Sequence, residues 1–360
     1  MFPLGTDGAP DGPGYTLPRA TFLADDGYSG ARHTAPPAVF RLGTSPGAAP
    51  VRLRLRETGT GLRAALVVPA APAETLAADA TPYRGYLEVL PAGKALRVVN
   101  VVNIEDYVRG VVPNELSPLA APELEALKAQ AVAARTYALS YRGESTSKDY
   151  DLCATPACQV YRGRSSEHPL ADRAVEQTRG LLLEYRGAPI KALYTSACGG
   201  HTEDAENIFE GKRARPYLRG VACTSDKRAR RWQVHMTPGQ VAHAVGRYGT
   251  FNDVRDLEAR RVGVSGRIVE LAVIGDRDHK ELVLKGLDVR RGLGLKESLF
   301  VMGRERDAQG SVRRFVFTGQ GWGHGVGLCQ AGAFGMARAG AGFAQILTHY
   351  YTGVNLRKAY

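Results

Sequence analysis

One carboxylate lies at the end of an apolar segment of the sequence. The stretch YVRGVVPNELSP, residues 107–118, runs through apolar residues to Asn114 and Glu115 and then meets a second proline. Partial burial at this point would raise the pKa of Glu115 and make it a proton donor near neutral pH. The alternative is that Glu115 caps the helix that follows. The spacing of the residues leaves both interpretations open.

The segment at 121–142 predicts one long helix. Pro122 suits the first helical position, and acidic residues follow it at the positive end of the helix. Leucine and alanine occupy both sides of the projected helix, which indicates burial on all sides. Lys128 and Arg135 fall on the leucine stripe. A buried guanidinium requires a carboxylate or an anionic ligand, so Arg135 belongs either to a structural ion pair or to a site.

A second group of reactive side chains follows a predicted strand in YTSACGGHTED, residues 194–204. This segment holds hydroxyl, thiol, imidazole and carboxyl groups around a Gly-Gly pair, a density typical of a functional loop. Cys198 and His201 are three residues apart and would suit a nucleophilic pair. The alternative, which we favour for the cysteine, is an ordinary loop with a disulfide from Cys198 to Cys223.

The five cysteines leave their redox state and any bound metal open. Cys153 and Cys158 have the spacing C-x4-C, which suits either half of a zinc site with Cys198 and His201 or a short disulfide loop. The C-x2-C spacing of common zinc modules does not occur, so the metal signal is weak. Because the number of cysteines is odd, one thiol stays outside any disulfide unless a metal or a second chain takes it.

A third segment, GQGWGHGVGLCQAGA, alternates glycines with larger residues between positions 319 and 327. Alternation in an extended chain puts the glycines on one side, where another backbone or a ligand can approach closely. His324 then lies on the opposite face. A phosphate-binding loop is disfavoured, because no GKS/T sequence follows and no Rossmann unit surrounds the segment. A tight structural crossing with one buried histidine is the competing interpretation.

The elements that must position these groups predict an α+β fold. Residues 1–35 are rich in glycine, proline and aspartate, and we expect a flexible arm there. Residues 36–82 are β-rich, and alternating apolar residues continue the strand prediction as far as residue 112. The helix at 121–142 is the central buried element of the remaining chain.

Composition narrows the class of partner. The chain has 360 residues, 44% of them hydrophobic, and a formal net charge of +11. This charge either favours an anionic partner such as a wall polymer or only keeps the protein soluble. We expect no nucleic acid, since basic runs and aromatic-basic interleaving are lacking. No stretch reaches the length of a membrane span, and the N-terminus lacks the features of a signal peptide.

Four of these segments together resemble one family. They are YVRGVVPNELSP with EALKAQAVAARTYAL, DLCATPACQVYRG, YTSACGGHTE, and GWGHGVGLCQAGAFGMA with ILTHYYTGV. In this order, across residues 83–360, they look like stage II sporulation protein D and the related amidase-enhancer domain proteins. The resemblance implies one domain over 83–360, with the buried helix beside a groove that takes several sugar units.

The resemblance implies a lytic transglycosylase that cuts peptidoglycan glycan strands lacking stem peptides and leaves 1,6-anhydro products. The family's catalytic glutamate falls on Glu115 and its essential arginine on Arg135, which would hold the substrate or orient the glutamate. The implied location is extracytoplasmic, at the cell envelope, with an export leader not visible in this chain. We expect the substrate-binding residues among the remaining motifs: Lys128, Tyr194, Ser196, His201, Gly323, His324 and Gln330.

The sequence departs from the family pattern at one position. Some family members bind zinc through a His-Cys pair, and here Ala157 precedes Cys158. We therefore expect no cofactor, and we favour a disulfide between Cys153 and Cys158 or two thiols. The alternative function is a non-catalytic wall-binding protein that enhances an N-acetylmuramoyl-L-alanine amidase. A pure binder has no need of Glu115, and its presence favours the enzyme.

Overall fold

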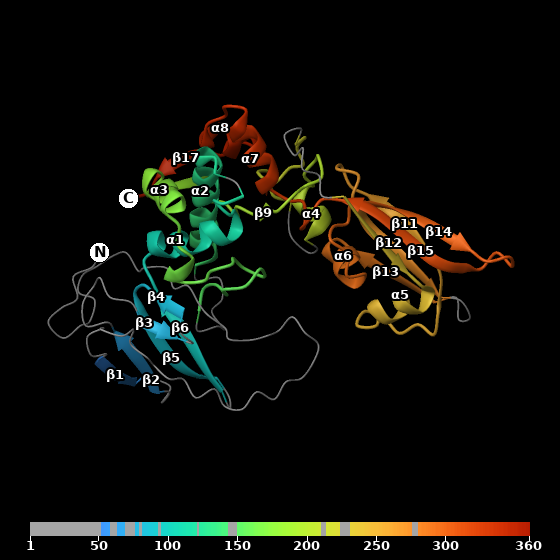
Figure 1. Ribbon diagram of the computed structural model, residues 1–360, viewed down its shortest axis with the longest axis horizontal. Helices are drawn as coiled ribbons and strands as arrows, with labels where there is room; N and C mark the ends of the chain where they lie inside the picture. The colour runs from blue at the N-terminus through green and yellow to red at the C-terminus, as the bar shows by residue number, and fades with distance from the viewer. Residues whose placement is uncertain are drawn as a thin grey trace. The chain divides into compact units, whose positions relative to one another are not determined.

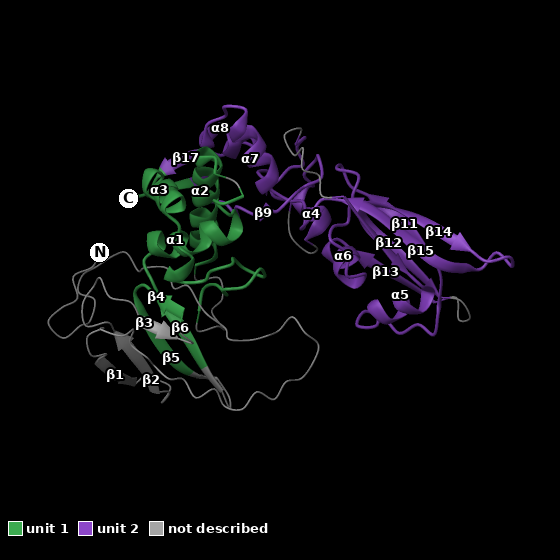
Figure 2. Ribbon diagram, in the orientation of Figure 1, with its two compact units in different colours: residues 1–182, 358–360 green, residues 183–357 purple. Residues whose placement is uncertain are grey.

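The computed structural model describes residues 52–57, 63–68, 76–78, 81–92, 95–120, 122–142, 150–209, 214–223, 231–275 and 280–360. The arm predicted at 1–35 and most of the segment at 36–82 lie outside the described residues. Helices and several small sheets occur together, which confirms the predicted α+β class. The chain forms two compact units, residues 1–182 with 358–360 and residues 183–357 (Figure 2). The residues expected to form one domain, 83–360, are therefore divided between two units.

The described part of unit 1 combines antiparallel strands with helices (Figure 1). One sheet has the strand order β1-β2-β5-β6, and β3 pairs with β4. The strands are β1 Arg52–Glu57, β2 Arg63–Val68, β3 Leu76–Ala78, β4 Thr81–Tyr83, β5 Tyr86–Ala92 and β6 Ala95–Val101. The helices are α1 Ile104–Glu115, α2 Leu124–Tyr141 and α3 Pro169–Gln177, with a 3-10 turn at Arg164–Ser166.

Helix α1 occupies residues for which the sequence predicted a strand, so that prediction was wrong from residue 104 onward. Its buried residues recur at helical spacing: Ile104, Tyr107, Val108, Val111 and Val112. Asn103 caps the helix, because its side chain accepts a hydrogen bond from the backbone N–H of Glu105 at 2.9 Å. Valine-rich sequence favours strands, but the cap and the helical period of the apolar residues outweigh that preference here.

Helix α2 confirms the central buried helix predicted at 121–142. Buried residues surround it on every side, and many of them are alanines: 126, 129, 131, 133, 134 and 138. Alanine is the best helix former and carries no side chain beyond Cβ. Helices α1 and α3 therefore pack closely against α2 (Figure 1).

Unit 2 contains small sheets and short helices (Figure 1). Its sheets have the orders β10-β15-β14, β11-β12-β13 and β17-β7-β8. The strands are β7 Leu181–Tyr185, β8 Ala188–Pro189, β10 Arg231–Met236, β11 Val254–Val262, β12 Ile268–Gly275, β13 Glu281–Lys285, β14 Phe300–Arg306, β15 Val312–Gln320 and β17 Asn355–Lys358. The division between the two units falls within β7, after Leu182. The helices are α4 Ala205–Ile208, α5 Pro238–Ala244, α6 Leu287–Gly292, α7 Gln330–Arg338 and α8 Phe343–Tyr350.

One apolar core joins the two three-stranded sheets β10-β15-β14 and β11-β12-β13. Phe315 and Phe317 of β15 are fully buried and share this core with Leu271 and Val273 of β12. Apolar residues of α5 and α6, among them Val241, cover the same cluster. These sheets form a rigid support for the loops that leave them.

A short parallel pair, β9 (Tyr194–Thr195) with β16 (Leu328–Cys329), brings together two motifs that are far apart in sequence. Tyr194 pairs with Leu328 and Thr195 with Cys329. The YTSACGG segment therefore lies beside the glycine-rich segment. Among the described residues, no helix has both the length and the apolar character that crossing a membrane requires.

Candidate active site

Glu115 is the last residue of α1 and is half-buried. Its Oε1 accepts a hydrogen bond of 2.7 Å from the backbone N–H of Val160. The N-cap of α2 is Glu123, so the interpretation of Glu115 as the cap of the following helix is wrong. One carboxylate oxygen is instead fixed by a backbone donor from a distant loop.

The loop that supplies this donor is braced against unit 1 by its neighbouring side chains. Gln159 is fully buried, accepts from the Tyr107 hydroxyl at 3.0 Å and donates to the carbonyl of Ala134 at 3.3 Å. Tyr161 donates to the Asn100 side chain at 2.9 Å. These contacts tie the segment on both sides of Val160 to α1, α2 and β6, and so hold the Val160 N–H against Glu115.

A glycine in α1 makes room for this loop. A Cβ on Gly110 would lie 2.4 Å from the ring of Tyr161, closer than atoms can pack. Burial raises the pKa of Tyr107 well above its usual value, and the negative charge of Glu115 adds to the rise. Tyr107 therefore stays protonated and keeps the hydroxyl proton that it donates to Gln159.

Cys153 and Cys158 form a disulfide, one of the two states expected for this pair. Sulfur atoms bonded to each other offer no thiolate to a metal. These two residues therefore do not fit the zinc site considered for this motif. The backbone N–H of Cys153 also donates to Cys158 Sγ at 3.1 Å, which keeps the loop before Val160 compact.

Arg135 makes a buried ion pair, and its partner is Glu105 rather than Glu115. The guanidinium donates from Nε to Glu105 Oε1 at 2.9 Å and from Nη2 to Oε2 at 2.6 Å, and it also donates to the carbonyl of Leu181. Arg135 has no exposed surface. Glu105 and Glu115 are ten residues apart on α1, about 15 Å of helix rise. The expectation that Arg135 orients Glu115 directly is therefore wrong. Because Arg135 is fully buried, the expectation that it contacts the substrate directly is wrong as well.

Glu105, a buried carboxylate of unit 1, was not identified by the sequence analysis. Burial raises its pKa, but the hydrogen bonds and charge of Arg135 outweigh burial and lower the pKa overall. The backbone N–H of Gly180 and the hydroxyl of Tyr360 also donate to Glu105 Oε1. The available signal was its place in the first turn of a capped helix, where a carboxylate is favourable.

Lys128 pairs with a neighbour on its own helix. Its Nζ lies 2.6 Å from Glu125 Oε1, an i,i+3 arrangement on α2, and its side chain is 15% exposed. This ion pair balances the positive charge of Lys128 near the start of a buried helix. A role of Lys128 in substrate binding stays a prediction.

The remaining predicted site residues lie in unit 2 around the β9–β16 pair. Tyr194 belongs to β9, and its backbone hydrogen-bonds to His324. The Ser196 carbonyl accepts from Ala331 N–H at 3.0 Å. Gln330 begins α7 and is buried. The structure therefore gathers five of the predicted residues at one crossing: Tyr194, Ser196, Gly323, His324 and Gln330.

Thr195, which the sequence analysis missed, organises this crossing. Its Oγ1 accepts from the backbone N–H groups of His324 and Gly325, both at 3.1 Å. A Cβ on Gly323 would lie 2.2 Å from the same oxygen. The predicted close approach to the glycine segment is confirmed, but the glycines act through left-handed backbone, with φ of +125° at Gly323 and +72° at Gly325.

His324 is half-buried and electrically neutral. Burial and the positive charge of Arg290 lower its pKa to about 3. Its Nδ1 accepts from Val326 N–H at 3.1 Å, and its ring meets Phe209 edge-on with centroids 5.3 Å apart. An imidazole in this state supplies no positive charge at neutral pH, which agrees with a structural histidine at the crossing.

His201 is half-buried, and its Nδ1 lies 2.6 Å from the carbonyl of Thr202. The loop around it is held by Arg267, a second residue missed from the sequence. Arg267 is fully buried and donates to the carbonyls of His201 and Cys198, both at 2.7 Å, and to Glu297 at 3.2 Å. The YTSACGGHTED segment is thus fixed through its backbone.

The disulfide expected between Cys198 and Cys223 is not formed. Both residues are thiols, as is Cys329. A hydrogen bond with Cys223 and burial raise the pKa of Cys198, and burial raises the pKa of Cys329. The Cys198–His201 nucleophilic pair also lacks support, since Cys198 is buried and the imidazole contacts a backbone carbonyl.

Comparison with known proteins supplies the family. The family model described as stage II sporulation protein matches residues 92–185, and a domain of unknown function matches residues 218–327. Stage II sporulation protein D of Bacillus subtilis (strain 168) is 33% identical over 277 residues, which cover 72% of this chain and 76% of that protein. The chain belongs to the stage II sporulation protein D family.

Two further relatives match more than two thirds of this chain. An uncharacterized protein of Brachyspira hyodysenteriae is 34% identical over 281 residues, covering 76% of this chain and 72% of that protein. The amidase enhancer of Bacillus subtilis is 28% identical over 298 residues, covering 69% of this chain and 40% of that protein. The sporulation model matches residues on both sides of Glu115, from β5 to β7, and so includes the disulfide loop.

Proposed function

We propose that this protein cleaves peptidoglycan glycan strands as a lytic transglycosylase, with Glu115 as its general acid and base. The family and the amidase-enhancer relative support a cell-wall-related role. The finer assignment rests on one observation, the half-buried carboxylate at the end of α1 whose Oε1 is held by Val160 N–H. The net charge of +11 suits an anionic wall polymer and a place at the cell envelope.

The proposed reaction needs a single carboxyl group. Glu115 protonates the glycosidic oxygen after N-acetylmuramic acid, and positive charge develops on the sugar as its bond to that oxygen breaks. The 6-hydroxyl of the same sugar then attacks the anomeric carbon and returns its proton to Glu115. The product is a 1,6-anhydro sugar and no water is consumed, so a second carboxylate at fixed separation is not required.

The surroundings of Glu115 suit this exchange of protons. An N–H donor at Oε1 favours a lone pair there, so we expect the transferred proton on Oε2. The braces at Gln159 and Tyr161 keep Val160 in place through both steps. A groove for several sugar units beside α2, with Lys128 among its contacts, remains part of this proposal.

Arg135 is a positioning residue in this proposal. Its ion pair with Glu105 joins α2 to the first turn of α1 and thereby sets where the far end of α1, with Glu115, comes to lie. Arg135→Ala should still weaken cleavage strongly, but through loss of α1 placement. We expect the activity loss to follow the loss of folded protein, whereas Glu115→Gln should lose activity while fully folded.

The test digests purified glycan strands with and without stem peptides and reads the products by mass spectrometry for anhydro ends. We expect cleavage of the strands without stem peptides, and none by Glu115→Gln. Glu176→Gln is the matched control, because this exposed carboxylate of α3 pairs with Arg109 at 3.2 Å. Anhydro products from Glu115→Gln at the parent rate would refute the assignment.

A second candidate function is enhancement of an N-acetylmuramoyl-L-alanine amidase without catalysis. The relative named amidase enhancer favours it. The discriminating assay adds the protein to such an amidase acting on whole peptidoglycan and follows peptide release. If the protein and Glu115→Gln stimulate release equally, and neither yields anhydro ends, the enhancer function replaces the lytic one.

A further inference from the structure

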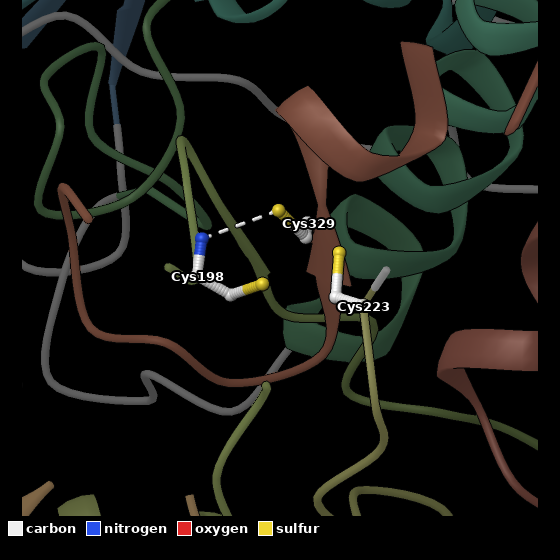
Figure 3. Close-up of side chains that lie close together, drawn as sticks. All are labelled: Cys198, Cys223 and Cys329. Atoms are coloured by element: carbon white, nitrogen blue, oxygen red, sulfur yellow. Dashed lines mark hydrogen bonds between the residues drawn. The ribbon is translucent and has the colours of Figure 1, made fainter. Parts of the chain in front are cut away.

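Three buried cysteines from separate segments of unit 2 point toward one another (Figure 3). Cys198 follows β9, Cys223 ends the segment paired with His201, and Cys329 joins β16 to α7. Their relative exposures are 0%, 2% and 0%. Their three Sγ atoms lie within 4.8 Å of one another. Side chains 131 residues apart, such as Cys198 and Cys329, meet here only because the fold brings them together.

The groups around the cluster donate hydrogen bonds to sulfur. Cys329 Sγ accepts from the backbone N–H of Cys198 at 3.2 Å and from that of Gly332 at 3.3 Å. The first of these is the dashed line in Figure 3. The backbone N–H of Gly200 hydrogen-bonds to Cys198. Donors of this kind stabilise anionic sulfur more than neutral sulfur.

The packing of α7 brings its first turn directly onto the cluster. A Cβ on Gly332 would lie 2.3 Å from Cys223 Sγ. Cys329 is the N-cap of this nine-residue helix, so the partial positive charge of the helix end faces its sulfur. The Tyr350 hydroxyl lies 3.0 Å from Cys223 Sγ and is fully buried. Without a cation, burial keeps these groups as thiols. Once a cation displaces their protons, the N–H donors and the helix end would help to stabilise the bound thiolates.

The three buried thiols would become thiolates only together with a cation, because unpaired buried charge is costly. Zinc–sulfur bonds are about 2.3 Å long, which places the sulfurs of a tetrahedral site roughly 3.8 Å apart. A separation of at most 4.8 Å needs only small side-chain movements to reach that value. The cluster contains sulfur alone among the described ligand groups, and such a donor set excludes Mg²⁺ and Ca²⁺, which prefer oxygen.

We propose that Cys198, Cys223 and Cys329 form a structural site for one thiophilic d10 cation that clamps the β9–β16 crossing. Binding exchanges three thiol protons for one metal ion and needs no oxidant. Zn²⁺ leaves a residual charge of −1 on the three thiolates and Cu⁺ leaves −2. The smaller buried charge makes Zn²⁺ the expected ion, and the Tyr350 hydroxyl lies beside Cys223.

The experiment uses the full chain, reduced and depleted of metal. Zn²⁺ is titrated against a chromophoric chelator, and we expect one equivalent to bind and to raise the thermal unfolding temperature. Co²⁺ in its place should give thiolate-to-cobalt charge-transfer absorption. Cys329→Ser should weaken zinc binding at least tenfold. The control is the double variant Cys153→Ser and Cys158→Ser, which removes the disulfide of unit 1 and should bind zinc normally.

A second measurement covers variants that fail to fold. Zn²⁺ should protect the thiols of Cys198, Cys223 and Cys329 in the unsubstituted protein from alkylation, as read by peptide mass spectrometry. One equivalent of Cu⁺ bound where Zn²⁺ fails supports the site and names the other ion. The proposal is overturned if neither ion binds the reduced chain, if the bound ion leaves these thiols unprotected, or if Cys329→Ser binds as tightly as the parent. None of these results depends on Glu115.

Discussion

The end of α1 in unit 1 and the β9–β16 crossing in unit 2 look alike in sequence and differ in structure. Both carry ionisable residues beside glycines. Around α1 the buried charges are balanced by an ion pair, Glu105 with Arg135, and a half-buried carboxylate, Glu115, stands at the helix end. At the crossing His324 is neutral and the cysteines are buried. A density of reactive residue types therefore does not identify the reacting group, whereas exposure and charge balance do.

The largest loss of stability is expected from removing the buried Arg135–Glu105 ion pair of unit 1. Arg135→Ala leaves Glu105 as an uncompensated buried charge, and we expect it to lower the free energy of unfolding by about 3–5 kcal/mol. Urea denaturation of the purified protein measures the change. Arg314→Ala, which breaks the exposed pair with Glu305, is the control and should cost less than about 1 kcal/mol. Equal losses in the two variants would remove the structural role of the Arg135 pair.

The crossing of unit 2 depends on close approach to glycine backbone as well as on the buried ion pair of Arg267 with Glu297. Gly325→Ala would place a Cβ 2.2 Å from the buried guanidinium of Arg267, at a φ of +72°. Gly187 has a φ of +81° with no atom within 4 Å of the same Cβ, so Gly187→Ala carries the backbone cost alone. We expect Gly325→Ala to lose about 1–3 kcal/mol more stability than Gly187→Ala. Matching melting curves for the two variants would contradict a crowded crossing.

The neutral state of His324 gives the crossing a pH dependence. Its pKa is 6.5 in the unfolded chain and about 3 in the folded one, so between these values only the unfolded chain binds the proton. The contribution of neutral His324 to the free energy of unfolding is therefore fully present above pH 6.5. It falls as the pH falls, by about 2 kcal/mol at pH 5. Urea denaturation at pH 7.5 and pH 5 should reveal this loss in the parent and a smaller one in His324→Gln. His235→Gln, at an exposed position of β10, is the control, and an unchanged loss in His324→Gln would contradict the assignment.

The smallest expected effect is on cleavage activity, and it tests the hydrogen bond that Val160, after the disulfide loop, donates to Glu115. Val160→Pro removes the N–H that holds Glu115 Oε1, and we expect cleavage of glycan strands to fall about tenfold in kcat/KM, or about 1.4 kcal/mol. Val160→Ala keeps the donor and should retain parental activity. Equal activity of the proline and alanine variants would leave the Val160 hydrogen bond without a part in catalysis.

Elements with a strong local signal were predictable, and those decided by distant partners were not. The alanine-rich composition of 121–142 was enough to predict α2 as a buried helix. Residues 104–112 were misread as a strand because valine occurs in both kinds of element, and the Asn103 cap was overlooked. Glu115 was singled out as a carboxylate at the end of an apolar segment, but its contact with Val160 could not be inferred, since the two are 45 residues apart.

The sequence by itself determined the α+β class, the buried helix, the motifs of the stage II sporulation protein D family and the need for glycine at the crossing, because these follow from local spacing and residue type. Tertiary structure decided that Arg135 pairs with Glu105, that Cys198 and Cys223 stay thiols beside Cys329, and that His324 is neutral. The physical reason is that pairing, burial and pKa depend on atoms brought together from 30 to 131 residues away. Spacing along the chain carries no record of those distances.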